Sequence, residues 1–505
     1  MSATLPAVRP VTGPAVTAGL RAWTGLAVLV LPTLLVAIDS TVLSIALPAI
    51  GAALAPSATE LLWIVDVYPL VLAGLLVTMG TLGDRIGRRR LLMIGSAGFG
   101  AVSALAAFAA SGWQLLAARV LLGFFGSMLM PATLALLRGL FVDPVKRRLA
   151  VAIWASGFAA GAAAGPLLGG ALLEHFWWGS VFLVNAPVMV GLLVALPLVV
   201  PESRNPAAGR LDLPGVALSL LAMTPIVLAI KMVAHDGPTP AAGAALAVGS
   251  TAAVAFVHRA RTRLAAGEEP LLDVTLFRSP VLRLSALANA TTMFGYTGLL
   301  FFSAQYLTLV VGLSPVETGV VLLPGFVVTM VAGIVASALG RRYRIGVLVP
   351  AGILTAATGL AVATLLSGDS IGLMVISSVL LGAGIGLSET ITNDAILAAA
   401  PPARAGSASA VSETAYEIGA VLGTAVLGSV LSAVYTSSVA ASDGPAHETL
   451  GGAVAEAARM SAQAGSALLD SARAAFLAGT SAAAAVGAAV LVAVAALVAV
   501  GLREH

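Results

Sequence analysis

The 505-residue sequence contains no cysteine, so disulfides, thiol nucleophiles and thiolate metal sites are all excluded. Charged residues are also scarce, at 10% of the chain, whereas about a quarter is usual for soluble proteins. No Gly-x-x-x-x-Gly-Lys-Ser/Thr loop is present, which argues against an ATP-driven exporter. The five histidines are scattered without metal-site spacing. We therefore expect no metal, no cofactor and no enzymatic activity, and nothing in the charge pattern indicates nucleic-acid binding.

Apolar residues, in contrast, are abundant: they make up 59% of the chain, and the mean hydropathy is +1.03. Apolar runs of about 20 residues, each long enough to cross a hydrocarbon core of about 30 Å, recur along the sequence. We therefore predict an all-α polytopic membrane protein. The fourteen candidate spans are residues 23–47, 61–80, 90–110, 114–137, 150–172, 180–200, 213–233, 240–258, 283–306, 317–339, 346–366, 371–396, 406–434 and 475–502.

Positive charges indicate how these spans are oriented, because cytoplasmic loops of membrane proteins are enriched in lysine and arginine. With the N-terminus inside, nearly all of the 26 Lys and Arg residues fall in cytoplasmic segments; the exceptions are Arg119, Lys231, Arg459 and Arg473. Both termini are therefore predicted to be cytoplasmic, in a bacterial inner membrane.

A basic loop after the tenth span, Gly340–Arg344, repeats in shortened form the loop after the second span, Gly80–Arg90. This echo predicts two related halves. The predicted regions are a disordered cytoplasmic tail over 1–22, an N-terminal six-helix half over 23–200, an inserted helix pair over 213–258, a cytoplasmic connector over 259–282 and a C-terminal six-helix half over 283–502. Paired six-helix halves are typical of transporters that work by alternating access.

Residues 435–474 form the one long external loop, rich in Ala and Ser and carrying several acids. A short helical hairpin over the outer mouth and an ordinary solvated loop both fit this composition.

The loop Gly80-Thr-Leu-Gly-Asp-Arg-Ile-Gly-Arg-Arg-Arg90 is the sharpest local motif. Its glycines permit a tight turn, and Asp84 can accept hydrogen bonds from the first amides of the next helix or pair with an arginine. We predict that this loop latches the two helix bundles on the cytoplasmic side, with Gly80, Asp84, Arg85, Gly87, Arg88 and Arg89 as its gating residues. The alternative is an ordinary cytoplasmic turn, whose arginines reflect only the general enrichment of positive charge in such loops and have no gating role.

Glycines recur every four residues in the fifth span, at Gly157, Gly161, Gly165 and Gly169, and therefore share one helix face. A neighbouring backbone can approach such a face closely, and Pro166 bends the helix there. Simple helix packing and a coupling role, through a dry contact that limits ion leak, both fit this spacing.

Charges inside the spans are the main functional signal, because each costs about 2.5–3.5 kcal/mol near the bilayer centre. The acids are Asp39, Asp66, Glu389, Asp394, Glu413 and Glu417. The bases are Arg119 and Lys231; Lys231 lies near the outer end of the seventh span and is expected to snorkel to the membrane surface.

A carboxyl group in a low-dielectric surrounding can exchange a proton near neutral pH, and its charge attracts a lipophilic cation. Protonation cancels that attraction and so couples proton entry to cation release. We predict that the proton-coupling residues are Asp39, Arg119, Glu389 and Asp394. The predicted substrate-binding residues are Asp66, Glu413, Glu417, Trp63, Tyr68, Phe158, Phe294, Tyr296 and Gln305, whose aromatic members can hold cations by cation–π attraction. For each of them, a structural contact between helices is the alternative.

These motifs resemble those of the major facilitator superfamily, and specifically its fourteen-helix drug:proton antiporters. Gly80–Arg90 is similar to the superfamily's Gly-x-Leu-Ala-Asp-Arg-x-Gly-Arg-Arg element, with Gly83 in place of alanine. Ala37–Pro48 is similar to the group's first-span motif, with Ser44 in place of asparagine, and Leu116–Gly123 matches the fourth-span motif centred on an arginine. The fifth span is similar to the antiporter motif, through Gly161, Gly165, Pro166, Gly169 and Gly170.

The resemblance implies a major facilitator fold with fourteen transmembrane helices, acting as a monomer. It further implies a proton-coupled antiporter that exports lipophilic, mainly cationic drugs, dyes and quaternary ammonium compounds. By the same resemblance, Asp66, Glu413 and Glu417 fall where cation-exporting relatives carry acids. The alternatives are an exporter of an endogenous metabolite, peptide, siderophore or lipid, and a transporter-like receptor or scaffold.

Overall fold

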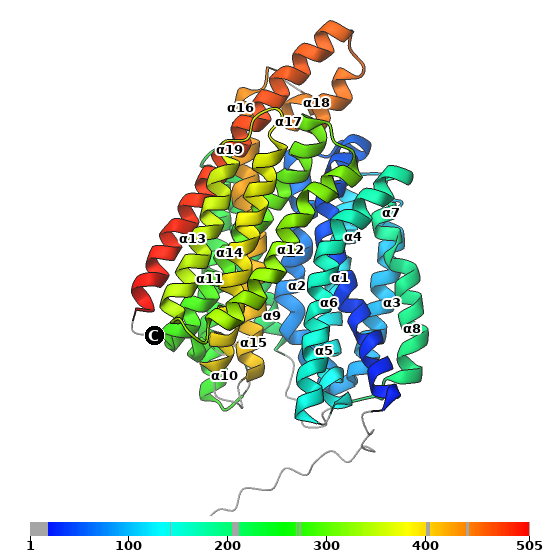
Figure 1. Ribbon diagram of the computed structural model, residues 1–505, viewed down its shortest axis with the longest axis vertical. Helices are drawn as coiled ribbons and strands as arrows, with labels where there is room; N and C mark the ends of the chain where they lie inside the picture. Colours follow the sequence, from blue (N-terminus) through cyan, green and yellow to red (C-terminus); the bar gives the residue numbers. More distant parts are fainter. Residues whose placement is uncertain are drawn as a thin grey trace, which may run out of the picture.

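The computed structural model describes residues 19–141, 143–204, 212–268, 270–271, 274–399, 405–440 and 444–503. Over these residues the regular structure is entirely helical, and the long helices run side by side along the long axis of the molecule (Figure 1). Residues 1–18, most of the predicted tail, lie outside the described residues.

The first half of the chain, as we call the region from α1 to α8, packs around one apolar core that includes Leu47, Ile64, Phe99 and Phe141. Its helices are α1 (Leu20–Leu54), α2 (Ala58–Ile86), α3 (Arg88–Ala106), α4 (Gly112–Gly126), α5 (Leu129–Leu140), α6 (Pro144–His175), α7 (Ser180–Leu183) and α8 (Asn185–Val199). Local sequence fixes some of the helix starts. Ser57 and Glu60, for example, form a capping box that satisfies the first amides of α2.

The second half, from α11 to α19, has its own core, which includes Phe302, Tyr306, Ile353 and Phe476. Its elements are α11 (Pro280–Gln305), the π-helical η2 (Tyr306–Val311), α12 (Pro315–Leu339), α13 (Ile345–Ala363), α14 (Ile371–Ala398), α15 (Ala405–Gly423), the π-helical η4 (Thr424–Gly428), α16 (Ser429–Ser438), α17 (Pro445–Glu448), α18 (Leu450–Ala457) and α19 (Ala462–Gly501). In the sequence, the two halves are separated by α9 (Leu213–Asp236), α10 (Pro240–Ala265) and the short η1 (Val274–Arg278). α9 packs against α10 and also against α2, α16 and η4.

Within the described residues, twelve helical segments are long and apolar enough to cross a membrane. They coincide with twelve of the fourteen predicted spans. α3 and α6 occupy the other two predicted spans, 90–110 and 150–172, but are not among the twelve. The count of fourteen and the cytoplasmic side of the termini stay predictions.

Helices occupy much of the segment predicted as the external loop 435–474. α18 packs against α17 and α19, and α17, α18 and the first part of α19 lie at one end of the bundle, the upper end in Figure 1. We call this the cap end, and the opposite end, where α1 begins and α19 finishes, the termini end.

The two halves meet closely where α6 approaches α12 at the cap end. A Cβ added to Gly170 would lie 2.5 Å from the carbonyl oxygen of Pro315, and one added to Gly319 would lie 2.6 Å from that of Pro166. Since only glycine has no Cβ, these positions allow backbone-to-backbone contact between the halves.

Candidate functional site

A cavity of about 320 Å³ lies between the two halves, and both contribute to its wall. From the first half come Ser40, Thr41, Ser44, Tyr68, Arg119 and Phe158, among others. From the second half come Met293, Tyr296, Phe326, Met330, Glu389, Glu417 and Thr424, among others. An apolar and aromatic wall with a few charged groups suits an amphipathic small molecule.

A buried ion pair reaches the cavity wall from the first half. Nη1 of Arg119 donates to Oδ2 of Asp39 at 2.8 Å, and the two residues are only 2% and 1% exposed. Nε of Arg119 donates to the carbonyl of Ile64 at 3.1 Å, and the ring of Tyr68 lies against the guanidinium, 4.3 Å from Cζ to the ring centroid. The proton-coupling candidates Asp39 and Arg119 are therefore in direct contact.

Asn185, which the sequence analysis missed, holds the other oxygen of Asp39. Its Nδ2 donates to Oδ1 of Asp39 at 3.3 Å and to the hydroxyl of Ser103 at 3.4 Å. The available signal was a lone amide in the apolar run 180–200, which is weaker than a charge in the same position.

Three acids of the second half lie at or beside the cavity. Glu389 of α14 and Glu417 of α15 line it, and Glu413 is one turn from Glu417 on the same face of α15. No ion pair to any of these three carboxylates is found in the part of the chain that the structure describes. Oε1 of Glu389 is buried and accepts no hydrogen bond from the described residues. These acids therefore give this side of the cavity a negative charge whenever they are ionised.

A polar network stands behind these acids and joins α11, α14 and α15. Nδ2 of Asn289 donates to Oδ1 of Asn393 at 3.0 Å, and Nδ2 of Asn393 donates to the hydroxyl of Tyr416 at 2.6 Å. The hydroxyl of Thr392 donates to Oδ1 of Asn289. The network therefore fixes Asn289, Asn393 and Tyr416 relative to one another where α11, α14 and α15 meet.

The expectation that Lys231 snorkels is wrong. Its Nζ lies 2.8 Å from Oδ2 of Asp66 and 4.0 Å from the centroid of the Trp63 ring, and Lys231 is only 3% exposed. The reason is that the face of α9 that carries Lys231 packs against α2 rather than facing lipid, so the ammonium meets a buried carboxylate. Asp66, predicted as a free substrate-binding acid, is therefore paired in this structure.

The other predicted site residues divide by position. Those that line the cavity are Tyr68, Phe158 and Tyr296. Those absent from its described lining are Trp63, Phe294, Gln305 and Asp394. Phe294 is buried in the second core, the amide of Gln305 donates to the carbonyl of Phe301 at 3.0 Å, and the side chain of Asp394 is exposed. The structure thus does not bring Asp394 to the cavity.

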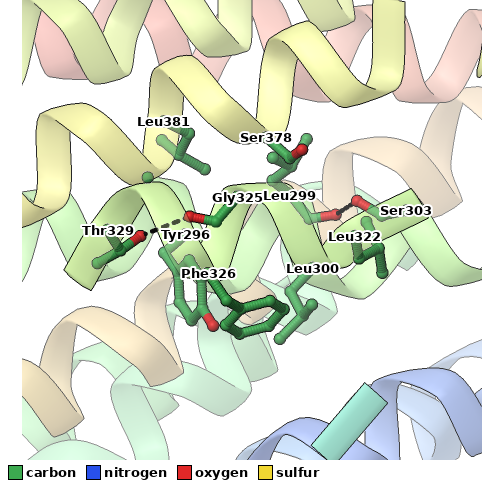
Figure 2. Close-up of a pocket in the computed structure, with 11 residues that line it drawn as sticks. Tyr296, Leu299, Leu300, Ser303, Leu322, Gly325, Phe326, Thr329, Ser378 and Leu381 are labelled. Atoms are coloured by element: carbon green, nitrogen blue, oxygen red, sulfur yellow. Dashed lines mark hydrogen bonds between the residues drawn. The ribbon is translucent and has the colours of Figure 1, made fainter. Parts of the chain in front are cut away.

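A small side pocket lies beside the cavity between α11, α12 and α14 (Figure 2). It has room for about 30 Å³, enough for a single small group, and shares Tyr296, Leu300, Phe326 and Thr329 with the cavity wall. The rings of Tyr296 and Phe326 meet edge to face, with centroids 6.2 Å apart.

The predicted gating loop turns at Gly87, whose φ of 114° favours glycine. Oδ1 of Asp84 accepts a hydrogen bond from Nε of Arg88 at 2.7 Å, so Asp84 pairs with an arginine rather than capping α3. Glu202, which the sequence analysis missed, caps α3 instead and accepts from the Arg89 amide at 3.0 Å. These contacts hold the loop to the segment after α8, and its role as a latch between bundles stays a prediction.

The glycines of α6 pack directly on α1. A Cβ at Gly161 would collide with the Leu34 carbonyl, one at Gly165 with the Thr41 side chain, and one at Gly169 would lie 2.6 Å from Cγ2 of Val42. Close packing is therefore observed, whereas a coupling role stays a prediction.

Residues 29–424 match the family model of the Major Facilitator Superfamily, so this chain belongs to that superfamily of membrane transporters. Among curated proteins, it is 51% identical over 450 residues to the multidrug efflux pump LfrA of Mycolicibacterium smegmatis, covering 88% of each chain. It is 37% identical over 432 residues to the methyl viologen resistance protein SmvA of Salmonella typhimurium, covering 83% of this chain and 84% of that one.

The fold is similar to that of a solved bacterial homologue of the human lysosomal transporter Spinster. The TM-score is 0.67 at 19% identity, with 96% of this chain and 98% of that chain covered. The apolar helices and the bacterial relatives of the same family identify the chain as a multi-pass protein of a bacterial inner membrane.

Proposed function

We propose that this protein is a proton-coupled antiporter that exports lipophilic, mainly cationic drugs, dyes and quaternary ammonium compounds by alternating access. One observation carries the proposal: Glu389, Glu413 and Glu417 lie at or beside an aromatic cavity between the halves, with no ion pair found among the described residues. The names of the relatives, a multidrug efflux pump and a methyl viologen resistance protein, support export of such compounds.

The cavity offers a lipophilic cation two kinds of attraction. Glu389 and Glu417 supply negative charge, and Tyr296 and Phe158 supply aromatic faces on the two sides of the cavity. The other lining groups are mostly apolar, so the ring system of a dye replaces water there. Such a site selects by charge and hydrophobicity rather than by a detailed pattern of hydrogen bonds, which suits a pump with many substrates.

Asp39 and Arg119 supply a route for proton coupling. In the structure their opposite charges balance, and Arg119 is part of the cavity wall. A proton that neutralises Asp39 would leave the guanidinium charge uncompensated next to a bound cation. In a low-dielectric site the resulting repulsion favours release of the cation. The carboxylates of the second half add to this effect when protons replace the cation on them.

Exchange in liposomes tests the proposal. The purified protein is reconstituted, a pH gradient is imposed, and ethidium is followed together with a proton-sensitive dye. We expect ethidium to move against protons, and Asp39→Asn to abolish uphill movement because it removes the carboxylate that is paired with Arg119. Glu268→Gln, a change at an exposed acid of the connector, serves as the control.

Retained uphill export by Asp39→Asn would remove Asp39 from the coupling role. Proton movement that required an endogenous metabolite, and that ethidium could not start, would instead favour a metabolite exporter with the same fold.

A further inference from the structure

The side pocket between α11, α12 and α14 lies directly next to the central cavity (Figure 2). Four residues line both spaces, among them Tyr296 and Phe326, so the two spaces share one wall. In Figure 2 the rings of Tyr296 and Phe326 lie on one side of the pocket, and Ser378 and Leu381 of α14 lie on the other. We call the first pair the mouth of the pocket and the second pair its floor. A substrate in the cavity can therefore reach the floor with a group that passes the mouth.

The pocket is apolar because its serine and threonine hydroxyls are already engaged. The Thr329 hydroxyl donates to the carbonyl of Gly325 at 2.9 Å, and the Ser378 hydroxyl donates to that of Val375 at 2.9 Å. The Ser303 hydroxyl donates likewise to a carbonyl within α11. No charged side chain is among the described residues that line the pocket. A polar group would find few partners here, whereas an apolar group gains free energy by leaving water.

Backbone contacts between α12 and α14 limit the shape of the pocket. A Cβ added to Gly325 of α12 would lie 2.9 Å from the carbonyl oxygen of Ser378, and one added to Gly382 of α14 would collide with the carbonyl of Gly325. A closer approach of these two helices therefore cannot close the pocket. Since one water molecule needs about 10–15 Å³, the volume of about 30 Å³ suits about two or three heavy atoms. This is the size of an ethyl group.

We propose that the side pocket is a specificity subsite for the short N-alkyl group of an aromatic cation, and that Leu381 at its floor limits the length of that group. The inference rests on the proposed function, because it assumes that the cavity binds aromatic cations. Tyr296 at the mouth can hold the charged nitrogen by cation–π attraction, while Glu389 and Glu417 supply negative charge from the cavity wall. The alkyl group on that nitrogen then enters the pocket. A methyl group leaves part of the pocket empty, an ethyl group fills it, and a propyl group meets Leu381.

Binding to the purified full-length protein in nanodiscs tests this with three dyes of one ring system and one charge. They are dimidium with an N-methyl group, ethidium with an N-ethyl group, and the N-propyl homologue. We expect ethidium to bind about fourfold more tightly than dimidium, because one more methylene is buried, and the propyl homologue to bind more weakly than ethidium, because it overfills the pocket. General hydrophobicity would instead raise the affinity evenly with alkyl length, and an even rise would overturn the proposal.

Variants of the floor test which residue sets the length. Leu381→Ala makes room and should move the tightest binding from the ethyl to the propyl dye, by about fourfold. Leu360→Ala on α13 is the matched control, because both leucines are buried in the same core but Leu360 is absent from the described lining of the pocket and of the cavity. It should keep the preference for the ethyl dye. Ser378→Val narrows the pocket and should lower the affinity for ethidium to that for dimidium.

A folded Leu381→Ala protein that still preferred the ethyl dye would overturn the proposal. If Leu381→Ala did not fold, Leu381→Val would be measured in its place, with the same outcomes. Ethidium–proton exchange by the unsubstituted protein reports separately on the proposed function. Dyes that were exchanged for protons but bound without the expected length dependence would overturn only the subsite, whereas failure of all three dyes to bind would overturn both.

Discussion

At the scale of single residues, the cavity carboxylates should decide which charges the protein accepts. Glu417→Gln keeps the size of the side chain but removes a negative charge from the cavity wall. We expect the affinity for ethidium to fall about tenfold, which corresponds to about 1.4 kcal/mol, while a neutral lipophilic drug binds nearly as before. Titration of both compounds into the purified protein measures the two affinities. An equal loss for both would assign Glu417 a structural role between helices.

The sequence predicts such charges well, because a charged residue inside an apolar run is conspicuous. Asp39 and Arg119 were found in this way, and the structure brings them together. Their partner Asn185 was missed because an uncharged amide stands out less. Lys231 was misplaced because sequence position gives its height along α9 but not which face of the helix it occupies, and packing against α2 decides that.

At the scale of helices, the contact between α6 and α1 depends on having no side chain at a few positions. Gly161→Ala would push a methyl group into the Leu34 carbonyl and separate the two helices. We expect the free energy of unfolding to fall by about 1–3 kcal/mol, as is usual for overpacking. Gly191→Ala on α8, where a Cβ meets nothing within 4 Å, is the matched control and should be neutral or slightly stabilising. Thermal unfolding in detergent compares the two, and equal midpoints would mean that the α6–α1 contact is loose.

The glycine period of the fifth span predicted this kind of contact but not its partner. Spacing shows that Gly161, Gly165 and Gly169 share a face, yet any neighbouring helix could have filled it. The structure assigns that face to α1 and turns Gly170 toward α12 of the other half. Which helix packs on the glycine face depends on how all the helices pack together, and a local sequence pattern does not carry that information.

At the scale of the whole molecule, hydropathy alone located the long apolar helices, because crossing a membrane requires both length and apolarity. It missed the short helices α17 and α18 in the predicted external loop. It could not locate the cavity, which arises only where residues far apart in sequence, such as Ser40 and Glu417, face each other across the two halves. Nor could it tell at which end of the bundle the halves meet.

Alternating access requires the contact between α6 and α12 at the cap end to break and re-form. Gly319→Val places a branched side chain against the Pro166 carbonyl, so the halves should no longer close there. Because the chain has no cysteine, Ser40→Cys gives a single thiol in the cavity wall. We expect a membrane-impermeant maleimide applied from the cap side to label this thiol slowly in the parent chain and several-fold faster with Gly319→Val. Ser466→Cys, exposed near the start of α19, should react equally in both backgrounds and so controls for access of the reagent. Unchanged labelling of the cavity thiol would show that the α6–α12 contact does not seal the cap end, and that closure depends on another pair of helices.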